Sequence, residues 1–316
     1  MRSIQTSVTF PLSSVKPFDG LLRYREYCLE AARKALQGAT RRRDRSPVTG
    51  ARMEPSGEVG GIAYARCPET GGLFLAEMPQ PAAWSALLQD VGKHRFAPDG
   101  FYSGLAQSRT DNVYAPKLEW IQDTLRLQGL KQPSILEAAT PHSTFTQLLD
   151  DSGRFSRVIT VDEMALTDGE TVQAAVLLES LDRVDDPAAL AKAVAGRLAA
   201  GGLLFVTALV SSGFDIAVLG LNNLYVYPPD RANCFSLSGL SRLLTDAGFS
   251  LVEVSTPGVL DVEIVRAHLR HDPTIRLSAF EQQLIDADSQ TLERLQAFLQ
   301  QQRLSSFARI VAKKTA

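Results

Sequence analysis

The spacing of apolar residues changes along the chain. In residues 20–38, apolar side chains recur every three or four positions, and residues 83–92 and 114–129 have the same helical spacing. From residue 133 onward, short apolar runs typical of buried strands alternate with helical patterns. The expected strands are residues 134–138, 157–162, 173–181 and 203–210, and the expected helices are residues 187–202 and 237–249. Strands that alternate with helices predict an α/β fold with a mainly parallel sheet and right-handed crossovers.

The segments on either side of this region have other patterns. Residues 46–80 are rich in Gly and Pro and contain short β-like pieces such as GGIAYARC and GGLFLAEM. Residues 259–316 have mostly helical spacing. We therefore divide the chain into an N-terminal helical segment (1–45), a small β-rich module (46–80), a helical linker (81–131), an α/β domain (132–258) and a helical C-terminal extension (259–316).

The composition is that of a soluble globular protein, with 45% hydrophobic and 22% charged residues. A net charge of -2 lacks the basic excess of nucleic-acid-binding proteins, so no nucleic acid is expected as a partner. The three cysteines, Cys28, Cys67 and Cys234, lie far apart in sequence, which suits a reducing compartment. The sequence shows no signal pattern and no uncharged apolar run of about 20 residues. We expect a cytoplasmic protein without membrane insertion.

Two longer stretches carry a resemblance to a known family. AAVLLESLDRVDDPAALAKAVAGRLAAGGLLFVTAL is similar to the fourth strand, helix, turn and fifth strand of class I S-adenosylmethionine-dependent methyltransferases. PPDRANCFSLSGLSRLLTDAGFSLVEVSTPG resembles a later segment of the same family, and STPGVLDVEIVR resembles a bacterial subgroup associated with sugars of surface polysaccharides. The resemblance covers residues 133–270 and implies a Rossmann-like fold. It also implies S-adenosyl-L-methionine as cofactor and a small molecule or a surface-sugar precursor as substrate.

The subgroup often carries an N-terminal zinc ribbon with two Cys-x-x-Cys pairs, and residues 46–80 resemble it. Only Cys67 remains of the four cysteines, because Ser46, Thr49 and Thr70 occupy the other three positions. A closed tetrahedral zinc site needs four good donors. We therefore expect a degenerate zinc ribbon that keeps its shape and binds no zinc, with Cys67 as a small buried side chain.

The turn after the first strand departs from the family pattern. ILEAATPHST keeps the acidic Glu137, but Ala138, Ala139, Thr140 and Pro141 stand where the family has a glycine-rich loop. Glycine lets the backbone approach a cofactor closely, whereas a Cβ narrows the approach and proline also removes a donor. We expect residues 138–144 to follow another path and their side chains to intrude on the methionine end of the cofactor. If the cofactor binds, Glu137, Ala138 and Ala139 are expected to contact it.

Two further acidic residues are candidates for cofactor binding. Asp162 ends the second expected strand and can accept hydrogen bonds from the ribose diol, or it can cap the next turn of the chain. Glu179 lies near the end of the third expected strand. Few residues separate Asp162 from residue 173, where the family has another helix and strand. Either the third strand is absent, or residues 157–162 correspond to the third strand and the second is absent.

The expected acid–base residues also differ from the family. Asp182 and Arg183 stand where the family often has Glu-His, and Arg231 replaces the histidine of a Pro-Pro-Asp-His stretch. Asp182 and Asp230 are candidate general bases, and Arg231 is the third candidate catalytic residue. Arginine stays protonated and can bind a phosphate or carboxylate through two hydrogen bonds, or it can form surface ion pairs. In the first case, the guanidinium groups of Arg183 and Arg231 should face one cavity.

These features support two hypotheses. The first is an active methyltransferase with an unusual cofactor loop, since methyl transfer depends mostly on positioning. The second is a pseudoenzyme that keeps the fold and serves as a binding or scaffold subunit, with an active methyltransferase-family protein as its partner. The fold alone does not decide between them, because function depends on the site.

Overall fold

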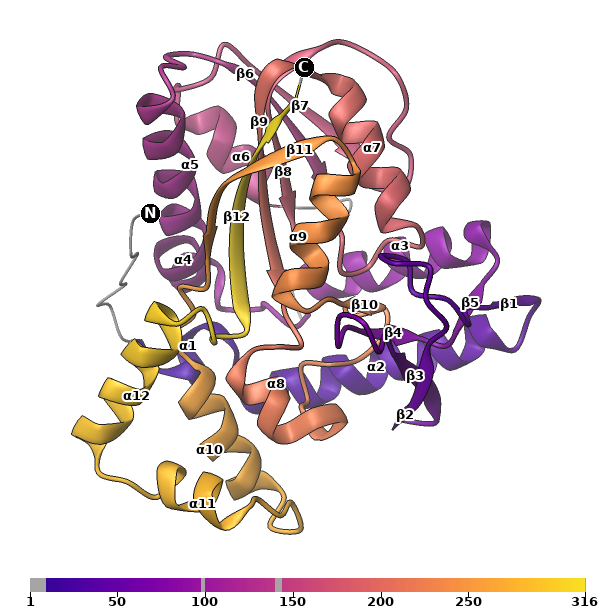
Figure 1. The fold of residues 1–316 in the computed structure, drawn as a ribbon, viewed down its shortest axis with the longest axis vertical. Helices are drawn as coiled ribbons and strands as arrows, with labels where there is room; N and C mark the ends of the chain where they lie inside the picture. The colour runs from indigo at the N-terminus through magenta and orange to yellow at the C-terminus, as the bar shows by residue number, and fades with distance from the viewer. Residues whose placement is uncertain (1–9, 98–99, 140–143, 316) are drawn as a thin grey trace.

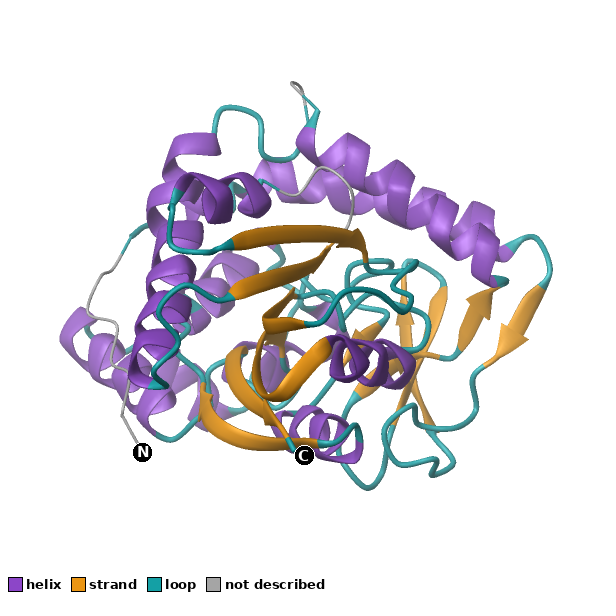
Figure 2. Ribbon diagram, turned by 90° about the horizontal axis from the view of Figure 1, so that it is seen from above, coloured by secondary structure: helices purple, strands orange, loops and turns teal. Residues whose placement is uncertain are grey.

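The computed structural model describes residues 10–97, 100–139 and 144–315. Its centre is a six-stranded sheet flanked by helices (Figures 1 and 2). In spatial order the strands are β11 (Phe249–Ser255), β12 (Phe307–Lys314), β9 (Leu198–Leu209), β8 (Val172–Leu178), β6 (Ser134–Ala139) and β7 (Arg157–Asp162). Strands β9, β8, β6 and β7 run parallel, and β12 runs antiparallel to both of its neighbours. The prediction of an α/β fold with a mainly parallel, Rossmann-like sheet is confirmed.

Helices cover both faces of this sheet. On one face, α5 (Ala115–Leu127) and α6 (Phe145–Asp151) bury Trp120, Ile121, Phe145 and Leu149 against the strands. On the other face lie α7 (Pro187–Arg197) and α9 (Leu237–Asp246), whose buried residues are Leu190, Ala191, Val194, Leu240, Leu243 and Leu244. Fully burying one such large aliphatic or aromatic side chain contributes about 1.5–3 kcal/mol. The two apolar faces therefore fix the position of the strands.

The helix boundaries follow local signals. The side chain of Asp186 accepts a hydrogen bond from the amide of Ala189 at the start of α7, and Ser236 does the same for Gly239 at the start of α9. The predicted helix over residues 187–202 is too long, because β9 begins directly after Arg197. Its two glycines lie within β9, where Gly201 has a φ of 74°. The glycine pair is therefore part of the strand and not a helix cap.

The connection between β7 and β8 is short. Residues 163–171, which the structure describes throughout, contain no helix or strand. Strand β7 pairs directly with β6, so β7 takes the place of the family's second strand. The element missing from the described residues is therefore the third strand, which would lie beyond β7 at the edge of the sheet.

The C-terminal region differs from its prediction. Helices α10 (Asp261–His271), α11 (Ala279–Ile285) and α12 (Ser289–Gln301) do form there. The last residues, however, form β12, which lies between β9 and β11. A helical extension over 259–316 is therefore wrong for residues 307–314, which complete the sheet. Helical spacing dominates the region before them and hides this single buried strand.

The N-terminal region contains helices and small sheets. Helix α1 (Leu12–Val15) precedes α2 (Phe18–Leu36), which buries Leu21, Tyr24, Cys28, Leu29 and Ala32. Strands β1 (Thr40–Arg42) and β5 (Glu77–Pro79) form one pair. Strands β2 (Glu54–Val59), β3 (Ile62–Arg66) and β4 (Leu73–Leu75) form a sheet with β10 (Asn233–Cys234). Helices α3 (Pro81–Phe96) and α4 (Ala106–Arg109) follow, and the π-helix η1 (Thr110–Tyr114) leads into α5. Because β10 belongs to the α/β part of the sequence, residues 46–80 are joined to that part by a shared sheet.

The four ribbon positions meet in space. Thr49 Oγ1 lies 3.6 Å from Cys67 Sγ, and the amide of Gly71 donates to the carbonyl of Cys67 over 2.8 Å. Burial opposes ionisation of the thiol, but hydrogen bonds from Ser46, Thr70 and Thr49 outweigh it and lower the pKa of Cys67 to about 7. Three hydroxyls therefore surround the thiol where the ribbon would hold a metal.

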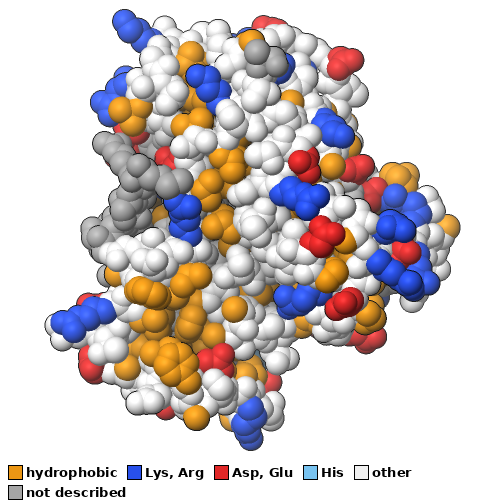
Figure 3. Space-filling view, viewed as in Figure 1, with side chains coloured by type: hydrophobic (Ala, Val, Ile, Leu, Met, Phe, Trp, Pro, Cys, Tyr) orange, Lys and Arg blue, Asp and Glu red, His pale blue; other side chains and the backbone are white. Residues whose placement is uncertain are grey.

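The surface shows charged and apolar regions (Figure 3). On the face shown, apolar side chains gather in the lower part of the molecule, the region of α10–α12. Phe280 and Phe298 in these helices are 70% and 50% exposed. Acidic and basic side chains are interspersed over the rest of this face, in keeping with the small net charge.

We predict that the purified protein contains no stoichiometric zinc. Three of the four ribbon donors are hydroxyls, which do not replace thiolates in a closed zinc site. Elemental analysis should find far less than one zinc per chain, and about one zinc per chain would contradict the prediction.

We also predict that Ser46→Cys, Thr49→Cys and Thr70→Cys together create a zinc site. Two thiolates on one tetrahedral zinc lie about 3.8 Å apart, and the 3.6 Å between Thr49 Oγ1 and Cys67 Sγ is close to this spacing. The triple variant should bind about one zinc and unfold at a higher temperature with zinc than with a chelator. The matched control is the triple variant that also carries Cys67→Ser, which should bind zinc far more weakly. Equal zinc binding by both variants would mean that the four positions do not form the site.

Candidate functional site

A cavity of about 380 Å³ lies at the C-terminal ends of the central parallel strands. Glu179 follows β8 directly, and Leu209 ends β9. Phe307 and Arg309 enter from the beginning of the antiparallel strand β12. Open α/β sheets bind their ligands at this edge, so the cavity is the candidate functional site.

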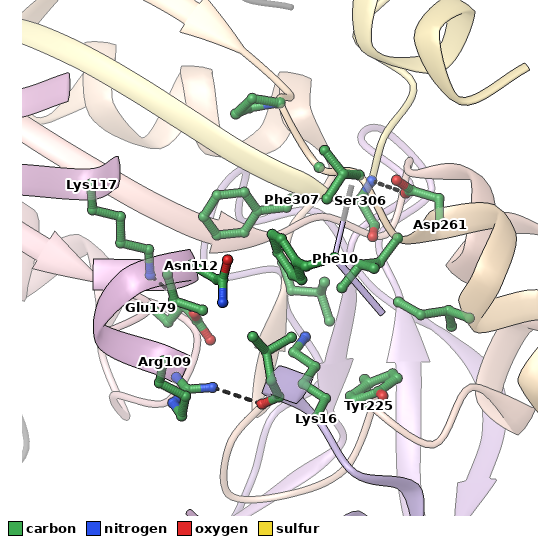
Figure 4. A pocket seen from close by; sticks show the side chains of 18 of the residues that line it. Phe10, Lys16, Arg109, Asn112, Lys117, Glu179, Tyr225, Asp261, Ser306 and Phe307 are labelled. Carbon is green, nitrogen blue, oxygen red and sulfur yellow. Dashed lines mark hydrogen bonds and ion pairs between the residues drawn. The ribbon is translucent and has the colours of Figure 1, made fainter. Parts of the chain in front are cut away.

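The other walls of the cavity come from both ends of the chain. Lys16 lies between α1 and α2, Arg109 ends α4, and Lys117 lies in the first turn of α5 (Figure 4). Apolar and aromatic side chains complete the lining, among them Leu21, Phe101, Tyr225, Tyr227, Leu260 and Ile264. The cavity thus combines charged groups, several of which gather around Glu179, with apolar and aromatic side chains, as small-molecule sites do.

Glu179 is the acidic residue around which these charged groups gather. It has a φ of 60°, a left-handed conformation that is rare for a residue with a side chain. Its Oε2 accepts a hydrogen bond from Arg231 at 2.6 Å, and its Oε1 lies 3.8 Å from Lys117 Nζ. Burial alone would raise the pKa of Glu179, but Arg231, Lys117 and Lys16 hold it well below its usual value. Glu179 is therefore an anchored anion and not a proton acceptor at neutral pH.

Lys117 is a buried base next to Glu179. Burial lowers the pKa of Lys117 to about 8, although Glu179 acts in the opposite direction. Arg109 is also buried, and its guanidinium stacks 3.6 Å from the ring centre of Tyr102 and donates to the carbonyl of Val15 at 3.1 Å. These side chains come from separate elements and reach the same part of the cavity.

Asp215 is another buried carboxyl group in the lining of the cavity. It lies in α8 (Phe214–Leu219). Its Oδ2 accepts a hydrogen bond from Asn223 at 2.9 Å, whereas its Oδ1 has no well-aligned donor among the described residues. Burial, together with the negative charge of Asp261, raises the pKa of Asp215 to about 7. A carboxyl group with this pKa can accept a proton at physiological pH.

The expected catalytic residues occupy different places. Asp230 and Arg231 line the cavity, and Asp230 forms an ion pair with Arg95. Asp182 does not line the cavity. Its Oδ2 lies 3.6 Å from Nη1 of Arg231 and accepts a hydrogen bond from the backbone amide of Leu209 at 3.0 Å. Burial raises the pKa of Asp182 to about 8. Two of the three expected residues are therefore available to a ligand.

Arg183 and Arg231 do not share a cavity. Arg183 donates to both carboxylate oxygens of Glu163, at 2.6 and 3.2 Å, and the pair is buried. It does not line the cavity that Arg231 lines. The prediction that both guanidinium groups face one cavity is wrong, because a carboxylate from the β7–β8 connection already binds Arg183.

The expected cofactor residues lie around the crevice between β6 and β8. The helix after β6 covers one face of the sheet and the helix after β8 covers the other, so the strand order reverses at this point. Glu137 is buried and accepts a hydrogen bond from Thr146 in α6. Asp162 accepts the amide of Met164 at 2.8 Å, so it caps the turn after β7. Apart from Glu179, none of the expected cofactor residues lines the cavity.

Ala138 and Ala139 continue β6 in parallel register with Val161 and Asp162. They are buried, and the hydroxyl of Ser180 donates to the carbonyl of Ala138 at 2.7 Å. Thr140 and Pro141 lie outside the described residues, so the path expected for 138–144 stays a prediction beyond Ala139. The Arg183–Glu163 pair borders the same crevice. The backbone amide of Glu163 donates a hydrogen bond to the carbonyl of Ala139 at the end of β6, and Arg183 donates one to the carbonyl of Leu178 at the end of β8.

The sequence patterns do not single out Lys16, Arg109, Lys117 or Asp215. Arg109 and Lys117 occupy ordinary helical positions and Lys16 lies between two helices; tertiary packing brings all three to the cavity. For Asp215, one signal was present, because it is an acidic residue that comes shortly after the fourth expected strand. Histidine, cysteine and carboxylate side chains in the described ranges form no group of three placed to hold a metal ion. Within those ranges there is also no helix with the length and apolar character of a membrane span.

One protein family and several solved structures are similar to parts of this chain. Residues 119–254 match the family described as "Methyltransferase domain". The fold is similar to that of 1,6-didemethyltoxoflavin-N1-methyltransferase from Burkholderia thailandensis, with a TM-score of 0.44 and 13% identity over 83% of this chain and 100% of that chain. It is also similar to a SAM-dependent methyltransferase from Thermotoga maritima, with a TM-score of 0.39 and 16% identity over 72% of this chain and 100% of that chain.

No curated protein matches the chain. The family match begins in α5, includes β6 to β9, and ends in β11, so it contains the strand ends that form the cavity. The part of the chain from residue 119 to residue 254 is therefore similar to the methyltransferase domain family.

Proposed function

We propose that this protein is an S-adenosylmethionine-dependent methyltransferase that acts on a small molecule bound in the cavity. The observation that carries the proposal is the position of the cavity at the C-terminal ends of β8 and β9, inside a methyltransferase-family domain. The resemblance of the sequence to a sugar-modifying subgroup supports a surface-sugar precursor as the substrate.

The residues at the strand ends fit S-adenosylmethionine in part. Glu137 and Asp162 place carboxylates on neighbouring strands, where they can accept hydrogen bonds from amino and hydroxyl groups. Ala138 and Ala139 leave less room than glycines do. When bound, S-adenosylmethionine supplies a methyl group activated by a positively charged sulfur.

The chain's own residues supply binding and proton transfer. Asp215 is the general base in this proposal, because it lines the cavity and its pKa of about 7 lets it take a proton from the methyl acceptor. Arg231 acts as a positioning residue that holds Glu179 at 2.6 Å. Asp230, paired with Arg95 in the cavity wall, is the alternative base.

The alternative is a pseudoenzyme that binds a small molecule, or an active methyltransferase relative, without methyl transfer. The Arg183–Glu163 ion pair favours it, because the pair is buried beside the crevice where cofactors of open α/β folds bind. The missing third strand removes a further wall on the same side. Cofactor binding distinguishes the two functions.

We predict saturable binding of S-adenosylhomocysteine and S-adenosylmethionine in a calorimetric titration. Asp162→Ala should weaken binding about 10- to 100-fold, since hydrogen bonds to a charged group contribute about 1.5–3 kcal/mol. Asp168→Ala is the matched control, because this aspartate is exposed in the same connection. Wild-type protein that binds neither compound at millimolar concentration would exclude the methyltransferase and leave the pseudoenzyme.

We predict that Asp215→Asn lowers kcat about 10²- to 10⁴-fold, the range for loss of a general base. A carboxyl group with a pKa of about 7 is protonated below this pH, so the rate should rise with pH through about 7 and level off above it. The variant should lose this rise, which a merely structural change would not cause. Asp150→Asn, at an exposed position in α6, should keep the wild-type profile. An unchanged pH profile in Asp215→Asn would assign the base to another group.

A further inference from the structure

Basic side chains gather on one side of the cavity. Lys16, Arg109 and Lys117 surround a single open space beside Glu179 (Figure 4). Arg309 reaches the cavity from β12, with its guanidinium 5.2 Å from the ring centre of Trp120. These four cations come from four separate segments of the chain, so their convergence is a property of the tertiary structure.

Most of these cations lack a carboxylate partner. Within the described residues, no Asp or Glu oxygen lies within 4.0 Å of Lys16, Arg109 or Arg309. Lys117 lies 3.8 Å from Glu179, whose other oxygen is bound by Arg231 at 2.6 Å. A buried charge without a counter-ion is costly. The lining of the whole cavity contains six basic and six acidic residues, but Lys16, Arg109 and Lys117 surround one space in which Glu179 is the nearest carboxylate. This part of the cavity therefore has a local excess of positive charge that an anionic ligand would neutralise.

We propose that the cavity binds a phosphorylated small molecule, with the phosphate between Lys16, Arg109 and Lys117. Three cations share one anchored carboxylate, and a doubly charged phosphate matches this excess better than a single carboxylate does. Its tetrahedral oxygens can accept hydrogen bonds from several directions at once. The organic part of the ligand would contact apolar side chains of the same lining, such as Phe101, Phe307 and Ile264. The inference deepens the proposed function by naming the charged group of its substrate.

The titration of the lysines provides a specific signature. Burial lowers the pKa of Lys117 to about 8; Arg109, Arg309 and Lys16 act in the same direction, and Glu179 opposes them. The pKa of Lys16 is also lowered, by burial and by Arg231 and Arg109, against Glu179 and Asp215. A bound dianion favours the charged form of both lysines and raises their pKa values. Anion binding near pH 8 should therefore take up protons from the buffer.

Sulfate is a suitable probe, because it is a tetrahedral dianion that does not titrate in this range. Calorimetric titrations at pH 8 in two buffers with different ionisation enthalpies measure the number of protons taken up. Because about half of Lys117 is uncharged at pH 8, up to about half a proton should come from this residue. The uptake from Lys117 should vanish at pH 6, where this lysine is already charged.

The variants Lys117→Met and Lys16→Met test whether these two lysines, from separate parts of the chain, bind the anion. Each should weaken sulfate binding about 10- to 100-fold, as expected for loss of a charge-assisted hydrogen bond. Lys117→Met should also lose the part of the proton uptake that comes from Lys117. Any uptake that remains in this variant comes from other groups, such as Asp215. Lys192→Met is the matched control, because this lysine is exposed on α7 and does not line the cavity.

Three outcomes would overturn the inference: no sulfate or phosphate binding to the wild-type protein at millimolar concentration, sulfate binding unchanged in both lysine variants, or tighter binding of succinate than of sulfate. Displacement of sulfate by S-adenosylhomocysteine would also overturn it, because the cations would then hold the cofactor's carboxylate. Sulfate binding with proton uptake, without any binding of S-adenosylhomocysteine, would support the anion site and contradict the proposed methyltransferase. The two proposals can therefore fail independently.

Discussion

The ion pair between Glu179 and Arg231 is the interaction on which the rest of the site depends. Glu179 follows β8 with a φ of 60°. One oxygen of its carboxylate lies 2.6 Å from Arg231, and the other lies 3.8 Å from Lys117. Arg231 also lies 3.6 Å from Asp182, which accepts the amide of Leu209 at the end of β9. The guanidinium of Arg231 thus connects the ends of two parallel strands, and Glu179 connects them to Lys117 in α5. Without the carboxylate of Glu179, the cations Lys16, Arg109 and Lys117 would repel one another around a shared space, so Glu179 makes this group of cations compatible with folding.

Much of the fold could be predicted from the sequence because its signals are local. Short apolar runs separated by helical patterns correctly predict β6, β7, β8 and β9. The strand β12 could not be recognised in this way, because it follows three helices and pairs with residues about 100 positions earlier. The site was harder to predict from the sequence than the fold. Asp230 and Arg231 lie in the Pro-Pro-Asp stretch that resembles the family. Lys16 and Lys117 line the same cavity only in the folded chain, where α5 and the segment after α1 meet at the ends of the strands.

The crevice between β6 and β8 is bordered by buried side chains. Ala138 and Ala139 are buried strand residues in place of a glycine turn, and the Arg183–Glu163 pair borders the crevice from the β7–β8 connection. This pair is possible because the connection is short. With no third strand among the described residues, Glu163 follows β7 closely and can reach the residue that comes shortly after β8. The altered loop and the missing strand therefore act on the same place, and any cofactor bound there must share it with a buried ion pair.

The N-terminal module contacts the segment that carries Arg231. The hydroxyl of Tyr64 donates to the carbonyl of Arg231 at 2.9 Å, and the amide of Leu75 donates to the carbonyl of Ala232 at 3.0 Å. Strand β10 pairs with β4, and Asn233 donates its side-chain amide to the carbonyls of Leu181 and Val184 at 2.8 Å. The module therefore holds both segments that place Arg231 against Glu179. Because these contacts come from β3 and β4, we expect the module to perform this positioning without zinc as long as both strands remain folded.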